Sequence, residues 1–314
     1  MKAMVFCAGL GTRMRPLTGV LPKPACPVLD VPLCWYGLAL LAGAGVGEVI
    51  ANTHHLADQM KSCLAGGARR LDLDIAVSHE PDILGTGGGL ARVAPRLRGG
   101  TFLLLNGDVL FDADVPAAVA AHRRTGAIAT MVVRAFPPGA PYRPVHVDPE
   151  GRVVRIAGDD PPPPGTTPWL FTGIHVLEPD ILAKLPQGVS GLHEDGYGPL
   201  LRAGARVMAH RDQGAWDDVG TPARYLEANL AVLGGAFPLA RFGRLGLSLP
   251  RGLTSWIGED ARVDGEVDQS VVGAGALVPE GAAVRHSVVW PGTELRRGEQ
   301  LDRCIAAGKL RVQG

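Results

Sequence analysis

A chain of 314 residues is long enough for one large α/β core and a smaller second unit, and its composition is that of an ordinary globular protein. Its 31 Lys and Arg residues balance its 31 Asp and Glu residues, so no overall field attracts nucleic acid or an anionic membrane, and we expect neither as a partner. The five cysteines form no Cys-x-x-Cys pair, and no apolar run is long enough for a signal-peptide core or a membrane span. We therefore expect a cytoplasmic protein.

The N-terminal third of the chain alternates short apolar strands with helices. Strands are predicted at residues 2–7, 48–53, 73–78 and 101–108, and helices at 32–44, from the second strand to about residue 65, and at 86–93. Such βαβ alternation is typical of an α/β fold with a mostly parallel sheet and helices on both faces. Binding sites in these sheets lie at the carboxyl ends of strands, where this chain has the segments AGLGTR and NGD.

From residue 128 to 176 the pattern changes to shorter strands separated by proline-rich turns. The predicted strands are 128–133, 144–147, 152–156 and 170–177, and they indicate a lobe of mixed strands beside the main sheet. A helix near Leu200, a strand at 206–210, a turn at 215–222 and a helix at 223–233 follow. We place the end of this first domain at residue 235.

After Gly234 apolar residues recur about every six positions, and a second apolar column follows one residue behind the first. Ile257 and Val263 begin a similar run in another register, so we expect an insertion at about residues 264–269. The pattern is typical of hexapeptide repeats and predicts a short left-handed parallel β-helix over residues 236–314, with a small β-sandwich as the alternative. The two columns are Val271, Leu277, Ala283, Val289, Leu295 and Leu301, and Val272, Val278, Val284 and Trp290.

A phosphate-binding loop is predicted at residues 8–13, because the amides of a glycine-rich segment after a strand can converge on a phosphate without side chains in the way. The segment lacks the Lys-Ser/Thr of a P-loop, and Met14 stands where a dinucleotide fingerprint needs glycine. Isolated charges in such loops are ordinarily solvated. Here Arg13, Arg15 and Lys23 add several cations beside the glycines, and this combination indicates an anion site.

The segments AGLGTRMRPLT and LPKP resemble the signature of the sugar-1-phosphate nucleotidyltransferases, and the runs LGTGGG, NGDV and WDDVGT follow in that family's order. The resemblance covers about residues 1–233 and is greatest to N-acetylmuramate-1-phosphate uridylyltransferases and mannose-1-phosphate guanylyltransferases. It implies a Rossmann-like catalytic domain that transfers a nucleoside monophosphate from a nucleoside triphosphate, UTP or GTP, to a sugar-1-phosphate. The products are pyrophosphate and an NDP-sugar for cell-wall or polysaccharide synthesis.

The resemblance also implies roles for individual residues. Arg13, Lys23 and Asp108 carry the catalysis, which agrees with the need to neutralise charge at the transferred phosphorus. The nucleotide-binding residues are Ala8, Gly9, Gly11, Thr12 and Arg13 around the triphosphate, and Gly85, Thr86, Gly87 and Gly88 beside the base. Without the other motifs, the latter run would rather be interpreted as a glycine-rich helix entry with no ligand.

Two aspartates are candidate metal ligands. Asp108 follows an apolar strand, where a carboxylate is well placed to hold a metal. By resemblance the second ligand is Asp218 rather than Asp217, and the cofactor is Mg²⁺, which takes few protein ligands. Either aspartate alone would rather be interpreted as a cap or turn residue.

The sugar-phosphate pocket is less well marked. The resemblance implies contacts from Lys23, Asn106, Thr172, Gly173 and Glu194. Where relatives have a Glu-Lys-Pro element, this chain has AGDDPPPP at residues 157–164, so that segment's sugar contacts are not carried over.

Two other classes of function stay open at this stage. One is a catalytically silent, regulatory relative that binds nucleotide sugars and assembles through its β-helix, although intact Arg13, Lys23, Asp108 and Asp218 argue against it. The other is a bifunctional enzyme with acetyltransferase chemistry at His286, although the tail is short for that activity. We expect a homo-oligomer, because the open coil ends of a β-helix need covering.

Overall fold

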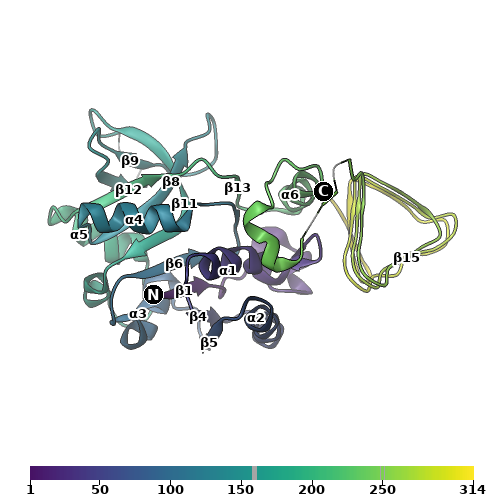
Figure 1. Cartoon of the computed structure of the whole chain (residues 1–314), viewed down its shortest axis with the longest axis horizontal. Helices are drawn as coiled ribbons and strands as arrows, with labels where there is room; N and C mark the ends of the chain where they lie inside the picture. Colours follow the sequence, from purple (N-terminus) through teal and green to yellow (C-terminus); the bar gives the residue numbers. More distant parts are fainter. Residues whose placement is uncertain (158–160, 248, 251) are drawn as a thin grey trace.

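The computed structural model describes residues 1–157, 161–247, 249–250 and 252–314. An α/β unit with a central sheet lies at one end of the molecule, and a three-sided coil of short strands lies at the other (Figure 1). Among the described residues, no helix combines the length and the apolar character needed to cross a membrane.

The central sheet contains nine strands, and those that carry the predicted motifs are parallel neighbours. β6, β1, β4 and β5 lie side by side and run in the same direction, which confirms the expected parallel arrangement in this half of the sheet. The strand order is β10 (Val153–Ile156), β9 (Val145–Val147), β11 (Thr167–Leu177), β6 (Phe102–Asn106), β1 (Lys2–Phe6), β4 (Glu48–Thr53) and β5 (Asp74–His79), with β8 (Ala129–Ala135) on β11 and β12 (Val207–Arg211) on β8.

The strands from residue 128 to 176 do not form a lobe beside the main sheet, as the sequence predicts, but continue it. The end of β11 pairs antiparallel with β6, so that Ile174 lies opposite Leu105. The first part of β11 pairs with β9. Because one strand of 11 residues spans both partners, the proline-rich turns interrupt the chain without dividing the sheet.

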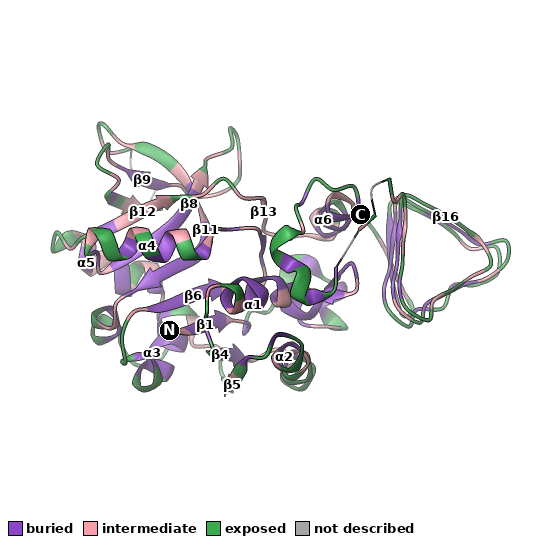
Figure 2. Ribbon diagram, in the orientation of Figure 1, coloured by how far each residue is buried: buried purple, intermediate pink, exposed green. Residues whose placement is uncertain are grey.

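Helices cover both faces of the sheet, and each face has its own apolar core (Figure 2). On one face the core is formed with residues from α1 (Leu33–Gly43), α2 (Ala57–Leu71), α4 (Val115–Thr125) and α6 (Pro222–Leu233). On the other face it is formed with residues from α3 (Gly85–Leu97) and α5 (Gly198–Arg202). Side chains that alternate along the strands, such as Val5 and Met4, enter the two cores in turn.

Three helices differ from the prediction. α2 extends to Leu71, and α3 continues past Val93 to Leu97, because Leu90, Val93 and Leu97 are buried against the sheet. The sequence analysis gives no element for α4. Its signals are nevertheless present, since Asp114 Oδ1 accepts a hydrogen bond from the Ala117 amide at 3.0 Å and a proline occupies the first turn.

Short elements connect the larger ones, and several of them surround the site. They are the 3₁₀ turns η1 (Thr12–Met14), η2 (Leu17–Gly19), η3 (Lys23–Ala25), η4 (Pro179–Lys184) and η6 (Ala240–Leu245), the π-turn η5 (Leu192–Tyr197), and the strand pairs β2 (Pro27–Val28) with β3 (Val31–Pro32) and β7 (Leu110–Phe111) with β13 (Trp216–Asp217).

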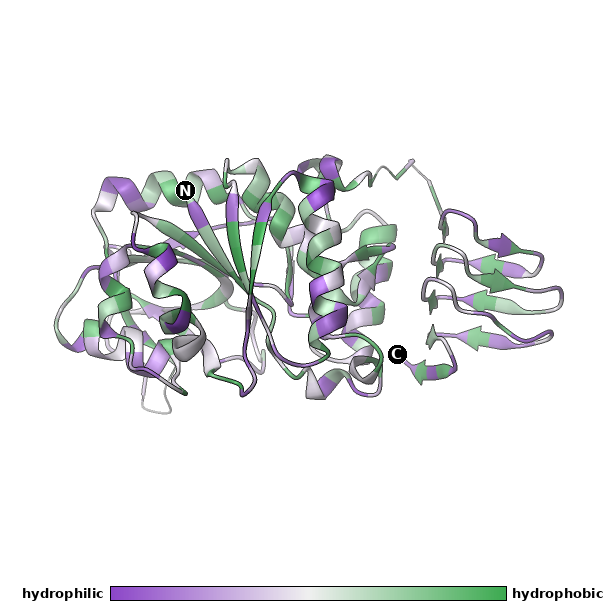
Figure 3. Ribbon diagram, turned by 90° about the horizontal axis from the view of Figure 1, so that it is seen from below, coloured by the Kyte–Doolittle hydropathy of each residue, from purple (hydrophilic) through white to green (hydrophobic). Residues whose placement is uncertain are grey.

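The coiled tail, residues 256–313, winds short strands into three sheets that form its three sides (Figures 1 and 3). Neighbouring strands from successive coils are parallel, as in β14–β17–β20–β22. Among the described strands of the tail, only the last one, β23, pairs antiparallel with its neighbour. The strands are β14 (Trp256–Ile257), β15 (Arg262–Val263), β16 (Glu266–Asp268), β17 (Val271–Val272), β18 (Leu277–Val278), β19 (Ala283–Arg285), β20 (Val288–Val289), β21 (Gln300–Asp302), β22 (Cys304–Ala307) and β23 (Leu310–Gln313).

The repeat in the tail is less regular than six residues. Trp256 pairs with Val271, 15 residues on, and Val271 pairs with Val288, 17 residues on. The expected insertion at 264–269 is therefore wrong, because β16 occupies these residues and pairs with β19 as an ordinary side of the first coil. The register changes instead because the turns are short. The coils span 15 and 17 residues, which is less than three six-residue steps would give.

Candidate active site

A cavity of about 240 Å³ opens at the carboxyl ends of β1, β4, β5 and β6. Eight of the predicted site residues line it, and five further residues that the sequence analysis did not single out complete its wall. The predicted ones are Ala8, Gly9, Gly11, Lys23, Gly85, Thr86, Asn106 and Asp108, and the others are Phe6, Pro24, Asn52, Ile83 and Glu80.

The glycine-rich loop after β1 is held in a conformation that requires glycine. Gly11 has φ +60°, and a Cβ there would lie 2.9 Å from Thr18 Cγ2 and 3.2 Å from Lys23 Cβ. Thr18 donates its hydroxyl to the Gly11 carbonyl at 2.9 Å, and His55 donates to the Thr18 carbonyl at 2.7 Å. A Cβ at Gly9 would meet no heavy atom within 4 Å, so this part of the loop leaves room for a ligand.

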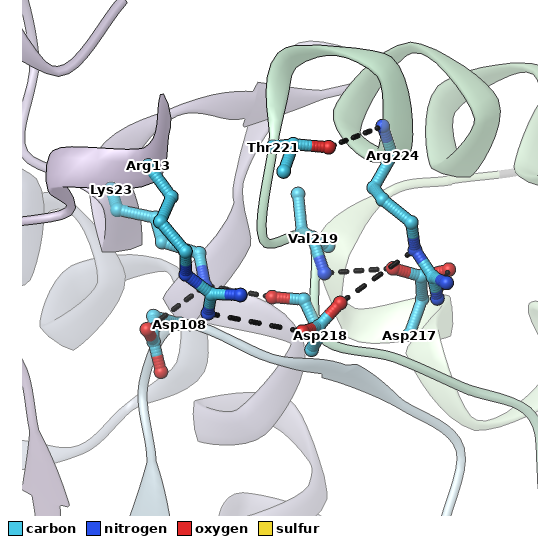
Figure 4. A network of polar contacts seen from close by, with 8 residues as sticks. All are labelled: Arg13, Lys23, Asp108, Asp217, Asp218, Val219, Thr221 and Arg224. Carbon is cyan, nitrogen blue, oxygen red and sulfur yellow. Dashed lines mark hydrogen bonds and ion pairs between the residues drawn. The ribbon is translucent and has the colours of Figure 1, made fainter. Parts of the chain in front are cut away.

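Lys23 connects the two predicted metal ligands. Its side chain is buried, and its Nζ donates to Asp108 Oδ2 at 2.9 Å and to the Asp218 carbonyl at 2.7 Å (Figure 4). The three residues come from η3, from the segment after β6 and from the turn before α6. The fold thus brings together a lysine and two aspartates that the sequence separates by 85 and 195 positions.

The two adjacent aspartates of the WDDVGT run have different surroundings (Figure 4). Asp217 accepts from the Val219 amide at 2.7 Å and from Arg224 at 2.8 Å, and burial raises the pKa of its carboxyl above the ordinary value. Asp218 directs its carboxylate to Arg13, 4.0 Å away, and to Arg224, 3.6 Å away. Asp217 therefore serves the turn, whereas Asp218 faces the predicted catalytic arginine.

Arg13 and Thr12 lie on η1, outside the residues that line the cavity. The Arg13 side chain is 70% exposed, so it is able to turn toward a bound anion. Gly220 allows the present approach, because a Cβ there would lie 3.2 Å from Arg13 Nη1 and 2.8 Å from Asp218 Oδ2.

The carboxylates of Asp108 and Asp218 offer oxygen atoms, which Mg²⁺ prefers as ligands. Among the described residues, no group of three or more His, Cys, Asp and Glu side chains is placed to hold a metal ion. A site with two carboxylates fits an ion that keeps phosphate and water among its ligands, and it does not fit a cation that needs a full cage of protein ligands.

A buried polar network that the sequence analysis missed lies against the cavity. Asn52 accepts from the Cys7 amide at 2.8 Å and donates to Glu80 Oε1 at 2.8 Å, and Glu80 Oε2 accepts from the Leu84 amide at 3.1 Å. These bonds join the ends of β1, β4 and β5 to the start of α3. The available signal was position, since Asn52 and Glu80 are polar residues at the carboxyl ends of parallel strands.

The LGTGGG run divides into two parts. Gly85 and Thr86 line the cavity, whereas the amides of Gly87 and Gly88 donate to the Ser190 carbonyl at 2.9 and 3.3 Å. A Cβ at Gly87 would lie 2.7 Å from Ser190 Oγ. In this structure Gly87 and Gly88 therefore permit close packing of α3 on the segment before η5, and their amides do not face the cavity.

The predicted sugar-phosphate residues are only partly together. Gly173, with φ +96°, lies against Asn106, because a Cβ there would be 3.0 Å from Asn106 Nδ2. The Thr172 hydroxyl is buried and donates to the Val132 carbonyl at 2.8 Å, and Glu194 is exposed on η5. Neither Thr172 nor Glu194 lines the cavity. Residues 158–160 of the segment that replaces Glu-Lys-Pro lie outside the described residues.

Comparisons with known proteins show the family to which the chain belongs. The family model described as Nucleotidyl transferase matches residues 2–234. The chain is 32% identical to a mannose-1-phosphate guanylyltransferase of Mycobacterium tuberculosis, over 99% of this chain and 81% of that protein. It is 29% identical to a UTP–glucose-1-phosphate uridylyltransferase of Synechocystis sp., over 99% of this chain and 88% of that protein. It is 34% identical to an N-acetylmuramate alpha-1-phosphate uridylyltransferase of Neisseria meningitidis, over 76% of this chain and all of that protein.

The fold is also found in a solved structure. The crystal structure of HddC from Yersinia pseudotuberculosis superposes with a TM-score of 0.61 at 19% identity and covers 73% of this chain and 97% of its own. At this identity the likeness supports the fold alone. The family match over most of the chain is decisive, and the chain belongs to the nucleotidyl transferase family.

Proposed function

We propose that this chain is a sugar-1-phosphate nucleotidyltransferase. It transfers a nucleoside monophosphate from a nucleoside triphosphate to a sugar-1-phosphate and releases pyrophosphate. The observation that carries the proposal is the convergence of Lys23, Asp108 and Asp218 beside the glycine-rich loop. The printed names of three relatives, two uridylyltransferases and one guanylyltransferase, support the same reaction class.

Asp108 and Asp218 would hold a Mg²⁺ ion, which when bound neutralises charge on the phosphate oxygens. The amides of Ala8, Gly9, Gly11 and Thr12 would hold the triphosphate, with Arg13 and Lys23 supplying fixed positive charge at the transferred phosphorus. Their task is to hold the attacking sugar phosphate and the triphosphate in line. No general base is needed, because the attacking phosphate oxygen is already ionised.

Gly85 and Thr86 would line the base pocket, and Asn106, Thr172, Gly173 and Glu194 the sugar side. UTP and GTP are the candidate nucleotides.

We assign the catalytic domain to residues 1–235 and a left-handed parallel β-helix of the hexapeptide type to residues 236–314, in a cytoplasmic homo-oligomer. Support for the tail comes from its three sides of parallel strands. The alternative of a silent, regulatory relative is disfavoured by the intact Lys23, Asp108 and Asp218 cluster. A monomer in light scattering would contradict the predicted homo-oligomer. Turnover of acetyl-CoA would support the alternative of acetyltransferase activity in the tail.

The test is a matrix of the four nucleoside triphosphates against glucose-, mannose- and N-acetylmuramate-1-phosphate with Mg²⁺, scored by pyrophosphate release. We expect release in at least one combination and its loss in an Asp108→Asn variant that remains folded. Turnover that survives Asp108→Asn unchanged would remove the assignment of this site, and silence across the matrix would favour the regulatory alternative.

A further inference from the structure

The segment that carries Lys23 continues directly into the hairpin formed by β2 and β3, which is held by α6. The turn of this hairpin consists of Leu29 and Asp30, whose φ angles are +46° and +65°. Non-glycine residues keep such angles only where their surroundings fix them. The Leu29 amide donates to Asn229 Oδ1 at 3.1 Å, and the Tyr225 hydroxyl donates to the Pro27 carbonyl.

The Asp30 side chain extends from this turn into the coiled tail. Its Oδ2 accepts from Trp256 Nε1 at 2.9 Å, and its Oδ1 accepts from the Ala274 amide at 3.0 Å. These donors belong to two successive coils. Each coil also has a glycine at the contact, because a Cβ at Gly258 would overlap Asp30 Oδ2 and one at Gly273 would lie 2.8 Å from Asp30 Oδ1.

The tail reaches the same hairpin by a second route. In the register of the coils, Gly258 is followed by Gly273 and then by Trp290 at the equivalent position. The Trp290 ring packs edge-on against Tyr225, with 6.2 Å between the ring centroids. Tyr225 is the residue that bonds Pro27, so successive coils contact both the turn and one strand of the hairpin.

These contacts complete a ring of interactions that includes the buried Lys23, the turn before α6, α6 itself and the hairpin. Lys23 Nζ bonds the Asp218 carbonyl, and α6 begins at Pro222, just after that turn. α6 then provides Tyr225 and Asn229 to the hairpin and packs against the tail (Figure 1). The hairpin leads back to Lys23 within seven residues, so a shift of Asp30 is transmitted to the lysine over a short and rigid path.

We propose that Asp30 is a positioning residue for Lys23 and that the coiled tail, through Asp30, fixes the catalytic lysine in place. The inference rests on the proposed function, in which Lys23 contacts the phosphates. It gives the tail a task within each chain, separate from any role in assembly.

The test is a double-mutant cycle that combines Asp30→Ala with Lys23→Ala, measured by pyrophosphate release with the substrate pair that the matrix identifies. In the wild-type background we expect Asp30→Ala to lower kcat roughly tenfold or more, because misplacing a catalytic group by about 1 Å has effects of this size. KM for the sugar phosphate should change less. In the Lys23→Ala background the same substitution should have no further effect.

Trp256→Phe is the milder companion variant, since it removes the N–H that bonds Asp30, keeps an aromatic ring and leaves Asp30 itself in place. If Asp30→Ala fails to fold, Trp256→Phe alone tests whether the contact between Asp30 and the tail positions Lys23. Arg285→Ala is the matched control, because it breaks the 2.7 Å ion pair with Glu266 on another side of the tail and should leave kcat unchanged. Where a Lys23→Ala rate is too low to follow, the cycle is run on the dissociation constants of Mg²⁺–GTP and Mg²⁺–UTP.

Equal fold losses in both backgrounds would overturn the proposal, since a purely structural role lowers the folded fraction whatever residue stands at position 23. Full kcat in a folded Asp30→Ala or Trp256→Phe variant would overturn it as well. Failure of the proposed function gives a different result, in which the wild-type protein releases no pyrophosphate with any substrate pair. Wild-type turnover in Lys23→Ala would instead remove the catalytic role of Lys23.

Discussion

Asp217 and Asp218 show how neighbouring identical residues acquire different tasks. The two oxygens of Asp217 are used by the Val219 amide and Arg224, whereas Asp218 faces Arg13 across 4.0 Å. A motif match distinguishes them only by position. The structure adds the physical reason, since a carboxylate already committed to a turn and to α6 has little capacity left for a metal ion.

The two substitutions Asp218→Asn and Asp217→Asn should therefore differ in kind. We expect Asp218→Asn to lower kcat/KM by about 10²- to 10³-fold, the usual effect of removing one electrostatic group from a transfer site, with little change in thermal stability. Asp217→Asn should cost about 1 kcal/mol of unfolding free energy, because its bond to Arg224 is lost, and should leave most activity. Kinetics and chemical denaturation of both variants check this, and the reverse pattern would contradict the assignment.

At the residue scale, the assignment of Lys23, Asp108 and Asp218 to one site rests on family resemblance, and the structure shows that Lys23 bonds both aspartates. Spacing alone cannot join positions that lie 85 and 195 residues apart, because only the folded sheet and α6 bring them together. Asn52 and Glu80 cannot be identified as part of the site from the sequence for a different reason. Each looks like an ordinary polar residue at a strand end, and their mutual hydrogen bond depends on two neighbouring strands.

The entry into α3 illustrates the element scale, because its glycines serve packing as much as binding. A Cβ at Gly88 would overlap the carbonyl oxygen of Gly188, which is backbone and cannot move aside. We expect Gly88→Ala to destabilise the protein by about 1–3 kcal/mol and to raise KM for the nucleotide, because α3 must shift. Gly99→Ala, where a Cβ would meet nothing within 4 Å, is the control for denaturation and kinetics. Equal stability of the two variants would contradict the packing role.

The contact between β11 and η5 contains the buried His175 and the half-buried His193 and should make stability depend on pH. Burial lowers the pKa of His175 well below its ordinary value of 6.5 and lowers that of His193 as well. Below pH 6.5 the unfolded chain binds protons at these positions and the folded chain does not, so the unfolding free energy falls as pH falls.

The contribution of His175 to the slope should approach about 1.4 kcal/mol per pH unit, and that of His193 should have the same sign. His175→Asn keeps a polar atom for Tyr197, which bonds His175 Nδ1 at 2.7 Å, and should reduce the slope between pH 6.5 and 5. Denaturation at a series of pH values measures this. An unchanged slope in the variant would mean that His175 titrates alike in both states.

Element types were predictable from the sequence, but their lengths and pairings were less so. The strand at 48–53 has the predicted bounds, because a run of apolar residues in a parallel sheet is buried on both faces. α4 was missed although its cap and proline are present. The prediction of a separate lobe was wrong, because β8, β9, β10 and β11 belong to the central sheet. A proline-rich turn indicates where the chain bends but not which strands pair.

At the scale of the whole molecule, the tail and the α/β unit share one core. Val271, Val288 and Ile305 of the tail belong to the same buried cluster as Tyr225 and Leu226 of α6. The predicted boundary at residue 235 rests on a change of pattern in the sequence. The continuity across it is not, because the periodicity of the coils does not reveal which of their three sides is covered.

We therefore expect the full chain to unfold in one cooperative transition, with calorimetry and tryptophan fluorescence giving the same midpoint. A chain ending at residue 235 should expose the apolar face of α6 and should melt at a lower temperature or aggregate. Scanning calorimetry and light scattering of both proteins measure this. Two separate transitions in the full chain, or an equally stable truncated chain, would contradict a shared core.

Three equivalent coil positions also limit which tail sequences can pack against this α/β unit. They are occupied by Gly258, Gly273 and Trp290. A tail transplanted from a relative would fit only if it had glycine at two successive coil positions, to admit the Asp30 carboxylate, and an aromatic ring on the third. Adding or deleting one coil between these positions would bring the wrong side chain to each contact. The number of coils before Trp290 is therefore constrained by the contacts of Asp30 and Tyr225 with the tail.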